Sequence, residues 1–197
     1  AIRSSVVVVV ITTLPISIAF GLIPSELISL LTSSQQAIEY GSRYLRIVGL
    51  GVPFAALNLV GSRALIGADD ARTPMLLRGG GAILNILING ILIFGLGMGV
   101  AGAAWGTVLS NVLITGAFVV GLVAGWLPGV GEFPVRVAAR GQYLAWADIR
   151  DIISIGTPVV GRNMVWTVTR FPMLAIVDIF GTTVVSAYVV TRRIWGL

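Results

Sequence analysis

Two pairs of polar side chains stand inside otherwise apolar stretches and are well suited to bind a ligand. Asn85 and Asn89 are four residues apart, and so are Thr107 and Asn111. At this spacing each pair shares one face of a helix. Buried amides and hydroxyls need hydrogen-bond partners, so we expect both pairs to face the interior of a helix bundle. They could bind a cation or a substrate, or they could only join helices, with roughly 0.6 kcal/mol per hydrogen bond.

A third polar group lies further along the chain. Asn163, Thr167 and Arg170 recur at helical spacing within another apolar stretch. A charged side chain at the centre of a bilayer costs at least about 2.5 kcal/mol, so these groups should face water or a partner. Arg170 could line a cavity with the other two, or its long side chain could extend to the outer headgroups. These three residues join the candidate cation- or substrate-binding set.

The composition excludes most other chemistry. The sequence contains no Cys and no His, which rules out disulfides, thiolate metal sites and His-dependent catalysis. The net charge is +5, but the Arg residues stand singly between apolar runs and form no basic stripe, so we reject nucleic-acid binding. We therefore predict that the chain is not an enzyme and uses no metal and no cofactor.

Long apolar runs must position the polar residues. The chain is 56% hydrophobic and 11% charged, with a mean hydropathy of +0.98, whereas soluble domains carry roughly 25% charged residues. Residues 79–131 contain no charged side chain; as one helix they would extend about 80 Å, against a hydrocarbon core of roughly 30 Å. We predict an all-α integral membrane protein, a polytopic helical bundle with about six spans. The predicted spans are 5–31, 44–67, 79–97, 100–126, 152–179 and 182–197.

The Arg residues predict the orientation of these spans. Seven Arg fall on one side of the alternating spans, and two, Arg43 and Arg46, fall on the other. Short cytoplasmic loops carry an excess of basic residues, so the first side is predicted to be cytoplasmic. The seven are Arg3, Arg63, Arg72, Arg78, Arg136, Arg140 and Arg150.

Three motifs in a fixed order resemble the multidrug and toxic compound extrusion (MATE) family of transporters. Residues 67–75, Gly-Ala-Asp-Asp-Ala-Arg-Thr-Pro-Met, are similar to a cytoplasmic loop of that family. The Asn85 to Asn89 segment, followed by Leu-Ile-Phe-Gly at 92–95, and then residues 99–107, Gly-Val-Ala-Gly-Ala-Ala-Trp-Gly-Thr, continue the likeness. Each motif is weak by itself, but their order is specific.

The resemblance implies a fold of two six-helix bundles, of which this chain holds spans three to eight of twelve. Residues 1–127 are then the remainder of the N-terminal bundle, with four spans. Residues 128–151, rich in Pro and Gly, are a cytoplasmic linker, and residues 152–197 begin the C-terminal bundle with two spans. We expect both ends of the chain to be truncations, because it starts without Met and stops inside an apolar stretch.

The implied function is that of a secondary active efflux transporter, an antiporter of the plasma membrane that exports small organic compounds in exchange for protons or sodium by alternating access. Its expected partners are a small-molecule substrate, membrane lipid and the missing helices. Some members carry a coupling Asp where this chain has Asn89, and an amide cannot titrate, so Asn89 can only coordinate or hydrogen-bond. The alternatives are a lipid-linked oligosaccharide flippase of the same superfamily and a non-transporting membrane subunit.

Overall fold

The computed structural model describes residues 2–31, 34–138, 145–168, 187–188 and 190–191. The chain divides into two compact units, Ala1–Ile149 and Arg150–Leu197. The first unit holds α1 (Ile2–Leu22), α2 (Pro24–Ser29), α3 (Gln35–Ile66), α4 (Arg72–Gly90), the π-helix η1 (Ile91–Gly95) and α5 (Gly99–Ala124). Helix α6 (Trp146–Val168) starts in the first unit and continues into the second. The predicted all-α membrane fold is confirmed.

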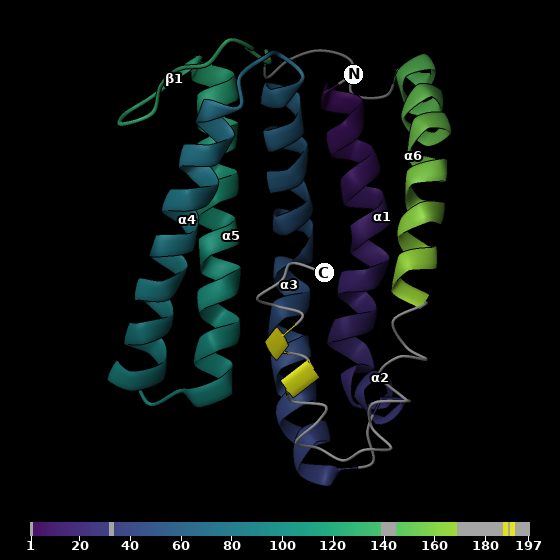
Figure 1. The fold of residues 1–197 in the computed structure, drawn as a ribbon, viewed down its shortest axis with the longest axis vertical. Coiled ribbons are helices and arrows are strands. Elements are labelled where there is room, and N and C mark those ends of the chain that lie inside the picture. Colours follow the sequence, from purple (N-terminus) through teal and green to yellow (C-terminus); the bar gives the residue numbers. More distant parts are fainter. Residues whose placement is uncertain (1, 32–33, 139–144, 169–186, 189, 192–197) are drawn as a thin grey trace. The chain divides into compact units, whose positions relative to one another are not determined.

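Four helical segments of the first unit are long and apolar enough to cross a membrane. They are Ile2–Leu22, Gln35–Ile66, Arg72–Gly95 and Gly99–Ala124, and Figure 1 shows them side by side and roughly parallel. These segments confirm the first four predicted spans. Helix α6 covers the first part of the predicted span 152–179, whose remainder lies outside the described residues, as does nearly all of the span 182–197.

The ends of the helices differ from the predicted spans at three places. The first span breaks at Ile23, because Pro24 lacks a backbone N–H and therefore begins a new helix. Helix α3 begins at Gln35, before the predicted residue 44. Helix α4 begins at Arg72, before the predicted residue 79, so Arg72 and Arg78 belong to a helix and not to a loop. Hydropathy finds only the hydrocarbon-crossing part of a helix, and charged turns extend beyond it.

Helix α3 is the central helix of the first unit and packs closely on both sides. A Cβ atom at Gly49 would lie 2.7 Å from Phe20 Cβ of α1, and the Ser17 hydroxyl of α1 donates a hydrogen bond to the Gly49 carbonyl at 2.6 Å. On the α5 side, a Cβ atom at Gly61 would lie 2.8 Å from the Phe118 ring. Small residues let membrane helices approach in this way, because lipid gives no hydrophobic force between helices.

The segment after α5 folds back onto the bundle. Strands β1 (Trp126–Leu127) and β2 (Gly131–Glu132) form a short antiparallel hairpin, seen at one end of the bundle in Figure 1. The Phe133 side chain that follows is buried in a cluster with Leu65 of α3 and with Phe118 and Leu122 of α5. The first residues of the predicted linker are thus packed against two spans.

Candidate functional site

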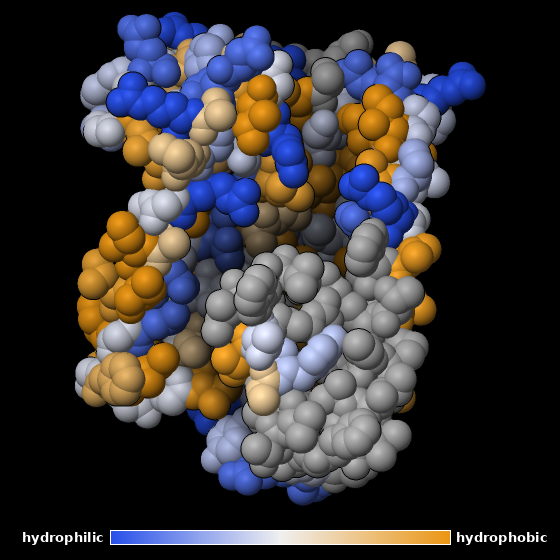
Figure 2. Space-filling view, in the orientation of Figure 1, coloured by the Kyte–Doolittle hydropathy of each residue, from blue (hydrophilic) through white to orange (hydrophobic). Residues whose placement is uncertain are grey.

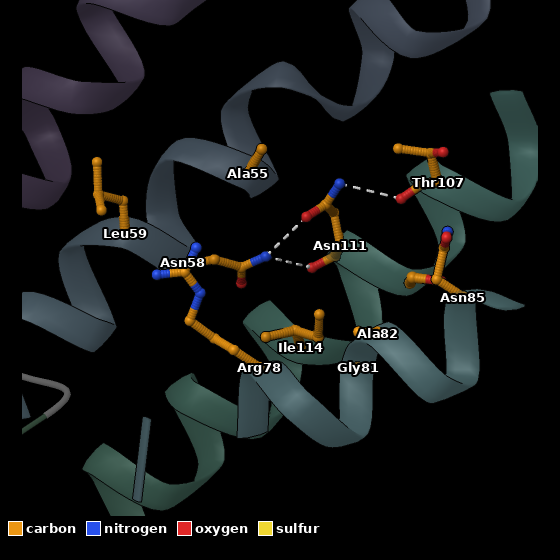
Figure 3. A pocket seen from close by; sticks show the side chains of 11 residues that line it. Ala55, Asn58, Leu59, Arg78, Gly81, Ala82, Asn85, Thr107, Asn111 and Ile114 are labelled. Carbon is orange, nitrogen blue, oxygen red and sulfur yellow. Dashed lines mark hydrogen bonds between the residues drawn. The ribbon is translucent and has the colours of Figure 1, made fainter. Parts of the chain in front are cut away.

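A polar cleft lies between three of the membrane-crossing helices. Its volume is about 340 Å³, within the range of small-molecule sites. Figure 3 shows side chains of α3, α4 and α5 surrounding it. We name it the α3–α5 cleft. It is lined by Ala55, Asn58, Leu59, Arg78, Gly81, Ala82, Asn85, Thr107, Ser110, Asn111 and Ile114.

One wall of the cleft is a hydrogen-bond network between α3 and α5. The buried Asn58 amide donates to the side-chain oxygen of Asn111 at 3.0 Å and to its backbone carbonyl at 3.3 Å. The Asn111 amide in turn donates to the Thr107 carbonyl at 3.0 Å, as Figure 3 shows. The Thr115 hydroxyl donates a hydrogen bond to Asn58 Oδ1 at 2.8 Å. Amide oxygens and nitrogens that would be costly in lipid are thereby satisfied.

The second wall comes from α4. Asn89 Nδ2 donates a hydrogen bond to Asn85 Oδ1 at 3.1 Å, which fixes the two amides as the i, i+4 pair that their spacing predicts. Asn89 Oδ1 is buried and accepts no hydrogen bond from the residues that the structure describes. It lies against Gly106 of α5, at the place where a side-chain carbon would otherwise stand. Gly106 therefore allows the amide of Asn89 to fit between the helices.

Arg78 is the charged residue among those that line the cleft. Its side chain is exposed, and it extends from α4 toward the part of α3 that holds Asn58 and Leu59 (Figure 3). No Asp or Glu is among the lining residues. Figure 2 shows hydrophilic surface at mid-height on the α4 and α5 side of the first unit, where it interrupts the apolar surface. The cleft can thus offer hydrogen bonds and one positive charge inside an apolar bundle.

Sequence comparisons identify the family. The MatE family model matches residues 1–91. The chain is 31% identical over 133 residues to DNA damage-inducible protein F of Escherichia coli, covering 66% of this chain and 28% of that protein. It is 28% identical over 190 residues to the probable multidrug resistance protein YpnP of Bacillus subtilis, covering 95% of this chain and 41% of the relative. The chain belongs to the MatE family.

Membership of the MatE family confirms the prediction of a membrane protein that is not an enzyme. The multidrug export protein MepA of Staphylococcus aureus is another relative, 24% identical over 189 residues, with 95% of this chain and 39% of that protein covered. Proteins of this family are transporters and not enzymes, and they are multi-pass proteins of the cell membrane. The chain spans 28% to 41% of the length of these three relatives. No solved structure matches the chain.

The structure brings together three of the seven candidate residues of this MatE chain. Asn85, Thr107 and Asn111 line the α3–α5 cleft, and Asn89 is hydrogen-bonded to Asn85 beside it. Of the remaining three, Asn163 and Thr167 belong to α6 in the second unit, where Asn163 lines a mainly apolar pocket with Val160, Met164 and Val168. Arg170 lies outside the described residues.

Asn58 and Arg78 line the cleft but were not among the candidates. Asn58 is a polar residue within the uncharged stretch from 48 to 61, so the argument applied to Asn85 and Asn89 would also have identified it. Arg78 was assigned only to the orientation of the chain, because the predicted span began after it. Its place in the cleft depends on α4 beginning at Arg72 and on the packing of α4 against α5. Spacing along one helix does not contain that information.

A second pocket lies at the end of the bundle that carries the hairpin. It is lined by the α3–α4 loop, including Asp69, Asp70 and Arg72, and by residues 130–134. Slight burial raises the pKa of Asp70, but hydrogen bonds from the side chain and backbone of Thr73 and the nearby Arg72 outweigh it and hold this pKa below its usual value. Asp70 Oδ1 accepts the Thr73 N–H at 3.0 Å, which satisfies a free donor of the first turn of α4. The Asp70 carboxylate therefore stabilises the start of α4.

Proposed function

We propose that this chain is part of a secondary efflux transporter that exports small organic compounds in exchange for protons or sodium. Membership of the MatE family supports this function, as do relatives named for multidrug resistance and multidrug export. The chain covers less than half of each relative described above, so the complete protein needs further helices. Its partners are a small-molecule substrate, the surrounding lipid and those helices.

The observation that carries the proposal is the α3–α5 cleft. Amide, hydroxyl and guanidinium groups gather there from three membrane-crossing helices. Asn85 is 13 positions beyond Arg72, the first residue of α4, which places it about 20 Å along the helix axis and well inside a bilayer. Polar groups at such depth are costly, and they mark substrate or ion pathways when they line a cavity.

In the proposed transporter, residues 1–127 are the N-terminal bundle, 128–151 the cytoplasmic linker and 152–197 the start of the C-terminal bundle. Alternating access requires two states of the protein that bind the substrate with different affinity, one open to each side. The α3–α5 cleft supplies binding groups of the first bundle. Asn163, Thr167 and Arg170 are proposed as the corresponding polar set of the second.

The coupling ion is proposed to be H⁺ or Na⁺. None of the residues that line the α3–α5 cleft is a carboxylic acid, so this cleft has no group that could exchange a proton with the cytoplasm. Amide oxygens such as those of Asn85 and Asn89 can coordinate a metal cation, because they are acceptors. A proton-coupled mechanism would accordingly use a titratable group elsewhere in the complete protein.

Alanine substitution in the full-length protein tests the proposal. We expect Asn85→Ala and Asn89→Ala each to lower gradient-driven transport of a multidrug substrate at least about tenfold, which corresponds to 1.4 kcal/mol of lost binding. Membrane insertion should be unchanged, because neutral amides contribute little to it. Ile86→Ala is the matched control, since Ile86 lies on the same helix with 69% of its side chain exposed. Wild-type rates in both asparagine variants would leave the pair with a packing role and refute the proposed site.

A further inference from the structure

The charged side chain that lines the α3–α5 cleft is positive. Arg78 brings a permanent positive charge, because a guanidinium does not lose its proton in proteins. No residue that lines the cleft is acidic, and among the described residues no carboxylate forms an ion pair with Arg78. A permanent positive charge without an acidic neighbour attracts anions.

Arg78 belongs to α4 itself and not to the loop that precedes this helix. It is six positions after Arg72, or about 9 Å along the axis. The side chain is directed across the cleft toward α3, as Figure 3 shows. One turn further, Gly81 gives room for the Ile114 side chain of α5, so that α4 and α5 pack closely beneath the guanidinium. A guanidinium used only to anchor the helix at the headgroups would not need to line a polar cleft.

The amides beside Arg78 add hydrogen-bond donors. Asn85 Oδ1 accepts from Asn89, whereas no hydrogen bond of Asn85 Nδ2 is found within the described part of the chain. Arg78 and Asn85 are seven positions apart, so they share a helix face and lie about 10 Å from each other along the axis. The guanidinium and the Asn85 amide thus offer donors at two points of one cleft that has space for a small organic molecule.

We propose that the α3–α5 cleft binds compounds that carry an anionic group, a carboxylate, sulfonate or phosphate, with Arg78 on the anion and the Asn85 amide on a second acceptor. Guanidinium groups bind such anions through paired hydrogen bonds that are stronger than neutral ones. This inference rests on the proposed export function and names its substrate class. The phosphate of a membrane lipid has the same chemistry and could enter the cleft from the bilayer.

Two dyes with the same xanthene ring and opposite charge test the inference on the full-length protein. Fluorescein is the anionic probe, and rhodamine 6G is the cationic one. In detergent solution we expect Arg78→Gln to raise the Kd for fluorescein at least about tenfold, because the charge-assisted hydrogen bonds to the anion are lost. The Kd for rhodamine 6G should stay the same or fall. Arg78→Lys keeps the charge but not the paired geometry and should lie between the two. Arg63→Gln is the matched control, since Arg63 of α3 is exposed and does not line the cleft.

The results separate this inference from the proposed function. A fluorescein to rhodamine affinity ratio that is equal in the wild type, Arg78→Gln and Arg63→Gln overturns the anion site. If the ratio is equal in these proteins and the wild type still exports rhodamine 6G along an ion gradient, only the anion site is overturned. The proposed export function then stands. If no dye is exported but the ratio depends on Arg78, the binding site stands and the export function fails.

Lipid composition distinguishes the two sources of the anion. The same binding is measured in nanodiscs of phosphatidylcholine with and without phosphatidylglycerol. If the affinity for fluorescein is the same with and without phosphatidylglycerol but is lower in Arg78→Gln, the cleft is assigned to a free organic anion. Affinity that phosphatidylglycerol lowers in the wild type, but not in Arg78→Gln, assigns it to a lipid phosphate. Fluorescein binding that responds to phosphatidylglycerol equally in both proteins shows an effect of membrane charge alone and overturns the inference.

Discussion

At the scale of single residues, Asn58 joins the two helices that form most of the cleft. Its amide reaches both the side chain and the backbone of Asn111, and its oxygen lies within hydrogen-bond distance of Thr115. Only 7% of Asn58 is exposed, so its amide relies mainly on these partners. Removal of the amide leaves polar atoms on α5 without their partner in an apolar surrounding.

We therefore expect Asn58→Ala to destabilise the first unit by about 0.5–2 kcal/mol, the scale of hydrogen bonds between membrane helices. Thermal unfolding of the full-length protein in detergent, followed by circular dichroism, measures the effect. Leu50→Ala on the same helix removes a side chain that is 54% exposed and should change the midpoint much less. Equal midpoints for the two variants would show that the Asn58 network adds no stability.

The residues of the site were partly predictable from sequence. A polar side chain within an apolar run indicates a buried polar contact. This rule identifies Asn85, Thr107 and Asn111, and it applies equally to Asn58. The rule does not say which of the polar residues meet. Arg78 faces the cleft only because three helices pack around it, and that arrangement depends on contacts between residues far apart in the chain.

At the scale of elements, the approach of α4 and α5 depends on glycines of α5. Gly106 faces the Asn89 amide, and Gly102 faces the backbone of Leu92 in η1, where an added Cβ would lie 3.0 Å from the Leu92 carbonyl oxygen. Both glycines are buried. Gly102, Gly106 and Ser110 recur every fourth residue on one face of α5, and all three are buried.

Gly106→Ala should force the Asn89 amide out of its place and separate α4 from α5. We expect a loss of about 1–3 kcal/mol of stability, as for an overpacked core, together with a lower yield of folded protein. Gly116→Ala is the matched control on the same helix, because no atom lies within 4 Å of a Cβ atom added there, and alanine favours a helix over glycine. Gel-filtration yield and thermal midpoint in detergent compare the variants. A Gly106→Ala protein as stable as Gly116→Ala would contradict the close packing described here.

At the scale of the whole molecule, several of the Arg residues counted for the predicted orientation belong to the same end of the first unit. The α3–α4 loop and the hairpin line one pocket, so they share an end of the bundle. Arg3, at the start of α1, donates a hydrogen bond to the Ala138 carbonyl at that end. The counted charges Arg3, Arg63, Arg72 and Arg136 therefore cluster on one side because the helices alternate in direction.

Single cysteines test which side faces the cytoplasm. Cysteines placed at Ala71 and Ala138 should react with a membrane-impermeant maleimide only in inverted vesicles, and one placed at Ser34 should react in intact cells. All three positions are exposed. Reaction of the Ala71→Cys protein in intact cells would reverse the orientation and, with it, the helix numbers inferred from the family resemblance.

The larger features of the fold could be predicted from the sequence because they follow from hydropathy alone. Four spans, their order and the membrane class come from long apolar runs that only helices can satisfy in lipid. The hairpin was not predicted, because it depends on the packing of Phe133 against Leu65, which lies far from it in the sequence. The π-helical turn at Ile91–Gly95 gives no signal in an apolar pattern either.

Substrate protection of a cysteine in the α3–α5 cleft tests the central claim most directly. The chain contains no Cys, so Ala82→Cys can be studied in a full-length protein whose other cysteines are replaced. Ala82 is exposed and lines the cleft, whereas its neighbour Ile83 is 63% exposed and does not. The account predicts that a water-soluble methanethiosulfonate blocks transport by the Ala82→Cys protein, that a transported substrate slows this reaction, and that the Ile83→Cys protein shows neither effect. Full transport after complete modification at position 82, with a reaction rate that substrate leaves unchanged, would contradict it.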